Sequence, residues 1–123
     1  YNSPMRWEVE YTNQFEEWWE SLSEGLQNGV GAAIEELEEQ GPGLGRPLVD
    51  TVSGSRHHNM KELRPVVAGN IRVLFAFDPR RHAILLIGGD KTGRWKRWYA
   101  EHIPMADDLY DAYLNELREE GLL

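Results

Sequence analysis

The residue pattern predicts an α+β fold, in which a small, mainly antiparallel sheet carries an N-terminal helical hairpin and a C-terminal helix. One alternating segment near the N-terminus is followed by two segments with apolar residues at helical spacing. Three strand-like segments and a last helical pattern complete the order β-α-α-β-β-β-α. With 123 residues, 41% of them apolar, the chain is expected to form one domain over residues 1–123 with a single core.

The first half is expected to hold one strand and two helices. Residues 7–11 alternate apolar and polar side chains, as a half-buried strand does. Thr12-Asn13 then offers a helix cap, and Gly25 is expected to end that helix. A second helix is predicted from about Leu26 to Gln40, where Gly41-Pro42 stops it and an irregular stretch follows.

Three strands are expected next, at about residues 58–64, 71–77 and 83–87. In the second of these, alternate apolar residues share one face, so Arg72 must lie on the other face of the sheet. The third strand is continuously apolar, as a central strand covered on both faces would be, and Gly88-Gly89 is expected to end it.

A basic loop is predicted after the third strand, over residues 90–99, and a last helix after the loop. Pro104 is expected to open that helix, because proline fits the first turn, and Gly121 is expected to stop it.

Charge is distributed unevenly along the chain, whose net charge is −8 and whose isoelectric point is about 4.9. Residues 56–102 hold ten of the 13 Lys and Arg, four of the 21 acids and all four histidines. That stretch has a net charge of +6, and the remainder has −14. Because steering depends on the local field, a basic face on an acidic protein can still bind a polyanion.

Several classes of protein and site are disfavoured. The chain has no cysteine, which excludes disulfides and thiolate metal sites, and it has no apolar stretch long enough to span a bilayer. The N-terminus lacks the layout of a signal peptide, and Met5 is a candidate native start; a cytoplasmic protein is the expectation. No cofactor or metal is predicted, since His57-His58 lacks metal-site spacing and the glycines of residues 41–45 follow no strand.

Three segments together resemble the RelE/HigB family of toxins, in particular its phage-associated, HigB-like branch. Residues 59–64 (NMKELR) resemble the family's "K-x-L-R" strand, and residues 71–77 (IRVLFAF) resemble its "Y-R-V-x-Y" strand. Residues 83–92 resemble the apolar strand that ends in a basic turn, although Asp90-Lys91 stands where the branch often has two lysines. The chain is also acidic overall, whereas these toxins are commonly basic.

The resemblance implies a toxin of a type II toxin–antitoxin system that cuts messenger RNA in the ribosomal A site. It further implies inhibition by a cognate antitoxin, often a helix-turn-helix DNA-binding protein. The messenger RNA and the ribosome would be the other partners, and no membrane partner is expected.

RNA can be cut without a metal ion when its own 2′-hydroxyl attacks the neighbouring phosphate. The reaction needs a base, an acid and cations for the crowded phosphate. The position of each residue in the family motifs suggests the cations. Tyr99 lies near the position of a functional tyrosine in some relatives, and nearby cations would have to lower its pKa from about 10 for a base role. His102, with an ordinary pKa of about 6.5, could be the base or the acid. The candidate catalytic residues are Arg72, Lys61, Arg64, Lys91, Tyr99 and His102. Lys61 and Arg64 fall on opposite faces of a regular strand, so only a bulge or an end effect would bring them together.

RNA binding is expected from the basic segment that follows the last strand. Two tryptophans among cations can stack on bases, or can equally serve as core or antitoxin contacts. The candidate RNA-binding residues are Arg94, Trp95, Lys96, Arg97 and Trp98.

Two other functions remain open from the sequence. The fold also hosts ParE-like toxins, which inhibit DNA gyrase without catalysis. A degenerate toxin that retains only antitoxin binding is the other alternative. The antitoxin itself is expected either on the apolar and acidic helical surfaces or over the basic face.

Overall fold

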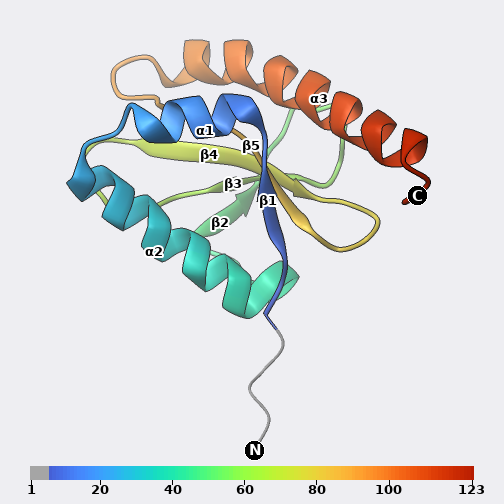
Figure 1. Ribbon diagram of the computed structural model, residues 1–123. Coiled ribbons are helices and arrows are strands. Elements are labelled where there is room, and N and C mark those ends of the chain that lie inside the picture. Colours follow the sequence, from blue (N-terminus) through green and yellow to red (C-terminus); the bar gives the residue numbers. More distant parts are fainter. Residues whose placement is uncertain (1–5) are drawn as a thin grey trace, which may run out of the picture.

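The computed structural model describes residues 6–123, so the candidate start at Met5 lies outside the described residues. The chain forms a five-stranded sheet of order β1-β5-β4-β3-β2, with α2 and α3 on opposite sides of the strands (Figure 1). The elements are β1 (Val9–Tyr11), α1 (Asn13–Glu20), α2 (Glu24–Gln40), the 3-10 helix η1 (Gly41–Gly43), β2 (Val49–Thr51), β3 (Met60–Leu63), β4 (Ile71–Phe77), β5 (Ala83–Asp90) and α3 (Trp95–Glu119).

Strand β1 pairs with β5 in parallel, and the other three pairings are antiparallel. The predicted α+β class, with a mainly antiparallel sheet, a helical hairpin and a C-terminal helix, is therefore confirmed. Among the described residues, no helix is both long and apolar enough to cross a membrane.

The apolar residues form two layers, one on each face of the sheet, where the sequence suggested a single core. Ile71, Val73 and Phe75 pack with the helical hairpin on one face. Leu74 and Ala76 pack with α3 on the other. The predicted alternation along β4 is thus confirmed, and it leaves Arg72 on the face that α3 covers.

The boundary between the two hairpin helices differs from the expectation. Helix α1 ends at Glu20, and Gly25, which was expected to end it, lies in the first turn of α2. The reason is a side-chain cap: the hydroxyl of Ser23 accepts a hydrogen bond from the backbone N–H of Leu26 at 3.3 Å. Thr12 caps α1 in the same way, through the N–H of Phe15 at 3.0 Å.

Gly88 and Gly89 do not end the third strand, which continues to Asp90. Their lack of side chains instead allows two tryptophan rings to lie against the sheet. A Cβ at Gly88 would overlap the ring of Trp18 from α1, and a Cβ at Gly89 would overlap the ring of Trp98 from α3. The glycine pair therefore sets how closely one helix on each face approaches the strand.

Helix α3 begins at Trp95, nine residues before Pro104, so half of the predicted basic loop is helical. Proline inside a helix deprives the carbonyl four residues earlier of its donor. That carbonyl belongs to Ala100, and both Ala100 and Pro104 are exposed, so water can replace the missing N–H. The helix is consequently able to continue through Pro104.

The short strand β2 was not predicted, because the stretch after Gly41-Pro42 was expected to be irregular. It pairs with β3 at the edge of the sheet, where Asp50 lies opposite Glu62. Only Val49 of its three residues is buried, so the strand has no alternation long enough to be detected.

The close approach at Gly88 leads to a stability prediction. We expect Gly88→Ala to lower the free energy of unfolding by about 1–3 kcal/mol, since overpacking displaces the ring of Trp18. Gly25→Ala is the matched control, because nothing lies within 4 Å of its added Cβ, and helix propensity should make it neutral or stabilising. Denaturant unfolding of both variants would measure the difference, and equal stability would contradict the proposed packing.

Candidate functional site

A pocket of about 370 Å³ opens between the β2–β3 edge of the sheet and the first turns of α3. It is on the sheet face that α3 covers, and it combines acidic, basic and aromatic side chains. The lining residues are Thr51, Val52, Ser53, Glu62, Arg64, Trp95, Lys96, Tyr99 and Ile103.

The carboxylate of Glu62 lies at the centre of this pocket's polar contacts, and the residue is only 3% exposed. Its Oε2 accepts a hydrogen bond from Nε of Arg64 at 2.8 Å. Its Oε1 accepts a hydrogen bond from the hydroxyl group of Tyr99 at 2.5 Å. A buried carboxylate is costly unless it is paired and hydrogen-bonded, and both conditions are met here.

Arg64 lies on the α3 side, as strand alternation requires for the residue that follows Leu63, which is buried against the hairpin. It comes directly after the last residue of β3 and shares the face of Met60 and Glu62. The guanidinium bridges Glu62 and Asp50, whose Oδ2 is 3.2 Å away. The strand is therefore regular here, and Lys61 and Arg64 lie on opposite faces.

Arg72 lies beside this group, with Nε 3.9 Å from Oε2 of Glu62. Its Nη1 donates to the carbonyl of Ile71 at 2.8 Å. The buried Nε–H has no hydrogen-bond acceptor among the described residues. An unpaired buried donor on a charged group is costly, and an anionic oxygen placed here would satisfy it.

Lys91 completes a group of three cations. Its ammonium lies 5.1 Å from the centre of the Tyr99 ring, in cation–π contact. Burial and the nearby positive charges of Arg72 and Arg64 lower the pKa of Lys91, although Glu62 opposes the change. Positive charges that lower the pKa of a neighbouring lysine also favour the binding of an added anion.

Tyr99 is protonated at neutral pH. Burial, followed by the hydrogen bond to Glu62, raises its pKa to about 12. In this arrangement the phenol is a proton donor, and it is poorly suited to the base role considered from the sequence.

Two candidate catalytic residues lie apart from this group. Lys61 pairs with Phe75 across the sheet, which places it on the hairpin side rather than the α3 side. The ring of His102 stacks on Trp98 at 4.3 Å, and its Nδ1 lies 2.8 Å from the carbonyl of Trp98. That carbonyl can only accept, so Nδ1 carries the proton.

The candidate RNA-binding residues divide into exposed and buried ones. Trp95 is 55% exposed and lines the pocket with Lys96, whose ammonium lies 5.5 Å from its ring centre. Trp98 is 0% exposed, because it is buried in the core between α3 and the sheet. In this position it cannot stack on a base. Arg94 is the N-cap residue of α3, and Arg97 lies in the first turn of that helix. Both are exposed, and both pair with Glu101.

The basic stretch does not form one continuous face. Arg56 is paired with Asp108 and Asp111 on α3. Arg80 is paired with Glu10 and Asp78 at the far end of β4. Cations with local carboxylate partners of this kind contribute little to a long-range field, so several of the cations outside the pocket are largely neutralised.

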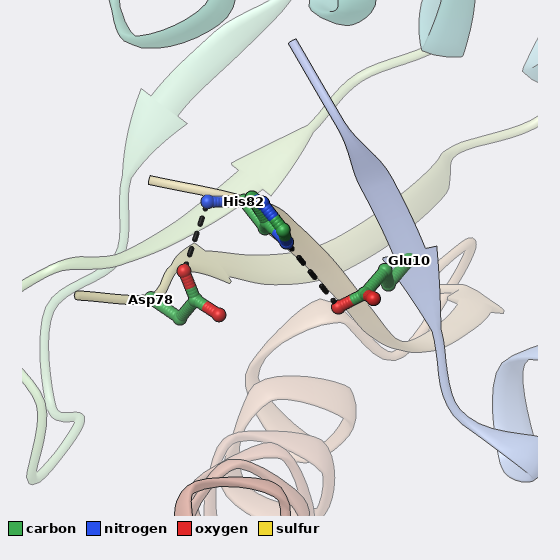
Figure 2. A group of neighbouring side chains, drawn as sticks. All are labelled: Glu10, Asp78 and His82. Atoms are coloured by element: carbon green, nitrogen blue, oxygen red, sulfur yellow. Dashed lines mark hydrogen bonds and ion pairs between the residues drawn. The ribbon is translucent and has the colours of Figure 1, made fainter. Parts of the chain in front are cut away.

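One group in the described part of the chain has the composition of a metal site. Glu10 from β1 and Asp78 and His82 from the β4–β5 turn bring their ligand atoms within 4.8 Å of one another (Figure 2). However, Arg80 donates to Glu10 at 3.0 Å and to Asp78 at 3.1 Å. A guanidinium therefore already supplies the positive charge that these carboxylates need, and we assign the group to an ion-pair network.

Sequence reasoning missed the acidic members of the site, Glu62 and Asp50. Glu62 was counted only as one of four acids within a basic stretch. Its signal was its position on the same strand face as Met60, which predicts a buried carboxylate that must be paired.

The dependence of Tyr99 on Glu62 gives a prediction. We expect Glu62→Gln to lower the pKa of Tyr99, because the negative charge is lost while the burial remains. A raised tyrosine pKa stabilises the fold below the unfolded value near 10, and this contribution is lost as the pH rises through the folded value near 12. Glu62→Gln should therefore lose alkaline stability at a lower pH than the parent protein.

The measurement is an NMR titration with ring-labelled tyrosine, in which Tyr99→Phe assigns the resonance. Tyr110 is the internal control, since burial raises its pKa without contact with Glu62. An unchanged Tyr99 titration in Glu62→Gln would contradict the assigned cause.

Comparison with known proteins identifies the family and supports the fold. Residues 17–111 match the family described as "Phage derived protein Gp49-like (DUF891)". Two solved structures share the fold: the intact Escherichia coli RelBE toxin–antitoxin complex, with a TM-score of 0.55 at 7% identity, and the RelB–RelE complex from Methanococcus jannaschii, with 0.56 at 12%. They cover 68% and 73% of this chain, and 95% and 99% of their own chains.

Two relatives come from Mycobacterium tuberculosis. "Putative toxin HigB3" is 54% identical over 101 residues, which is 82% of this chain and 88% of the relative. "Putative toxin HigB2" is 53% identical over 104 residues, which is 83% of this chain but about half, 52%, of the relative. The chain therefore belongs to the Gp49-like family of RelE/HigB-type toxins.

Proposed function

We propose that this toxin is a metal-independent endoribonuclease that cuts messenger RNA on the ribosome and thereby arrests translation. The observation that carries the proposal is the group of Arg64, Arg72 and Lys91 around Glu62 and Tyr99, beside an exposed tryptophan. It brings cations for a phosphate, proton-exchanging groups and a surface for a base together in and beside one pocket. The substrate would place the protein in the cytoplasm.

The cations would bind the scissile phosphate. The unpaired Nε–H of Arg72 is available to a phosphate oxygen, and Arg64 can offer its planar fork once it releases Glu62. Lys91 adds a point charge beside them. Three preorganised cations stabilise the doubly charged phosphorane more than the singly charged diester, which is the requirement for catalysis.

Proton transfer would involve Glu62 and Tyr99. When Arg64 turns from Glu62 to a bound phosphate, the carboxylate of Glu62 no longer has this cationic partner. It then acts as the base that accepts the 2′-hydroxyl proton. The electron pair of that hydroxyl forms the new oxygen–phosphorus bond, and the bond to the 5′-oxygen breaks. Tyr99, protonated because of its high pKa, donates a proton to the leaving oxygen.

We further propose that a cognate antitoxin holds the toxin inactive. The similar folds of the two RelE proteins were determined in complexes with their antitoxins. A helix-turn-helix protein is the expected antitoxin, on the resemblance to the HigB-like branch.

The test is a map of RNA 5′ ends after induction of the toxin in a bacterium. We expect new ends inside translated codons, and Arg72→Ala should reduce them by roughly 10²–10³-fold, as for loss of one transition-state donor. Arg118→Ala is the matched control, because Arg118 contacts Asn115 at the exposed end of α3 and does not line the pocket. Both variants should fold like the parent protein.

The possible results separate the alternatives. Growth arrest with broken DNA and no new RNA ends would contradict the nuclease proposal and favour a gyrase inhibitor. No arrest by the parent protein would indicate a degenerate toxin. Cleavage of purified RNA without ribosomes would support the nuclease proposal but contradict its dependence on the ribosome.

A second prediction concerns Trp95. We expect Trp95→Ala to weaken RNA binding by about 1–3 kcal/mol per stacked base with little change in stability, because the ring is exposed. Trp98→Ala should instead lower the free energy of unfolding by about 3–5 kcal/mol, since it empties a core position. Fluorescence anisotropy with a short RNA and thermal unfolding would compare them. Unchanged RNA affinity in Trp95→Ala would remove it from the interface.

A further inference from the structure

A second cavity lies away from the Glu62 pocket, between β1 and the helical hairpin. It is a groove of about 300 Å³, open along one side. Val9, Phe15 and Leu85 contribute apolar lining from β1, α1 and β5. Trp19 and Ile34, which are only partly buried, add the inner sides of the two helices.

The groove is apolar, but its surroundings are strongly acidic. Glu16 on α1 and Glu38 on α2 line it directly. The surrounding segment, residues 6–40, holds ten carboxylates and a single arginine. Arg6 pairs with Glu38 and Glu39, so most of these charges have no cationic partner among the described residues.

Two further features indicate that the groove is a contact surface. Tyr11 lies at its β1 side and is 57% exposed, so its ring extends the apolar surface of the groove to the outside. In addition, β1 is an edge strand that pairs only with β5 in the described part of the chain. Its outer edge is open to an added segment.

The charge restricts the occupant. Nucleic acid would be repelled by the carboxylates. A second copy related by a two-fold axis would bring the same acidic surfaces together, which is also unfavourable. A cationic protein segment with apolar side chains is complementary to both the lining and the rim.

We infer that this groove binds a basic, apolar-anchored segment of the cognate antitoxin, and that the Glu62 pocket is not its docking site. The inference rests on the antitoxin partner in the proposed function. It chooses between the two surfaces that the sequence left open, the acidic helical surface and the basic face. Binding at this groove would hold the toxin from the hairpin side of the sheet, opposite α3.

The test measures binding of the full-length cognate antitoxin by calorimetry at low and high salt. We expect Glu16→Lys/Glu38→Lys to weaken binding at least tenfold at low salt and to reduce its salt dependence. The matched control is Glu17→Lys/Glu35→Lys, which makes the same change in net charge at exposed positions that do not line the groove. The control should bind within about twofold of the parent protein.

Tyr11→Ala is a second variant, since an exposed side chain can be removed without disturbing the fold. It should also weaken antitoxin binding about tenfold, while growth arrest by the toxin alone is unchanged. Hydrogen exchange should show protection in β1, α1 and α2 on binding. Peptides tiled across the antitoxin should bind only where the segment is basic and carries apolar residues.

Each result bears on one hypothesis. Equal binding by the groove variant and its control, or protection confined to the Glu62 pocket, would overturn the inference and leave the nuclease intact. A parent protein that binds no antitoxin would remove both the partner and the groove's assignment. Self-association that Tyr11→Ala abolishes would make a second copy the occupant instead.

Discussion

The burial of β4 and β5 on both faces is the constraint on which the rest of the structure depends. Helices must cover each face, and the glycines at positions 88 and 89 let one tryptophan from each side lie directly against β5. Polar side chains are therefore excluded from the centre of the sheet. They collect where coverage ends, and the β2–β3 edge beside the start of α3 is one such place, occupied by Glu62, Arg64 and Tyr99.

Glu62 explains how so many cations are held close together without a ligand. A carboxylate that is almost fully buried needs a positive partner and hydrogen-bond donors. Arg64 supplies the positive charge, and both Arg64 and Tyr99 donate hydrogen bonds to it. The carboxylate thus occupies a place that suits another anion. Exchange of carboxylate for phosphate would cost little reorganisation of the arginines, and it would also free a base. One arrangement would in this way account both for charge neutralisation without a ligand and for the proposed catalysis when a phosphate binds.

Much of the fold could be predicted from sequence because its elements have long periodic patterns, as in β4 and α2. What could not be predicted depended on short or nonlocal features. Three-residue β2 has no period, and the role of Gly88-Gly89 is visible only once Trp18 and Trp98 are placed. In the site, motif position suggested Arg64, Arg72 and Lys91 as candidates, and the structure places these three residues close together around Glu62. Lys61 was separated from them by strand alternation, and Glu62 was overlooked because its importance comes from burial.

The separation of charge between the two faces reconciles an acidic protein with the proposed RNA substrate. The unpaired carboxylates belong mainly to the hairpin, whereas several cations outside the pocket are neutralised by partners such as Asp108, Asp78 and Glu101. At physiological salt, screening over roughly 8–10 Å lets the two faces act independently. A phosphate at the Glu62 pocket would then experience mainly the local cations, while the acidic hairpin repels RNA from its own side. Net charge consequently predicts little here, because the local arrangement of charges determines which face an anion approaches.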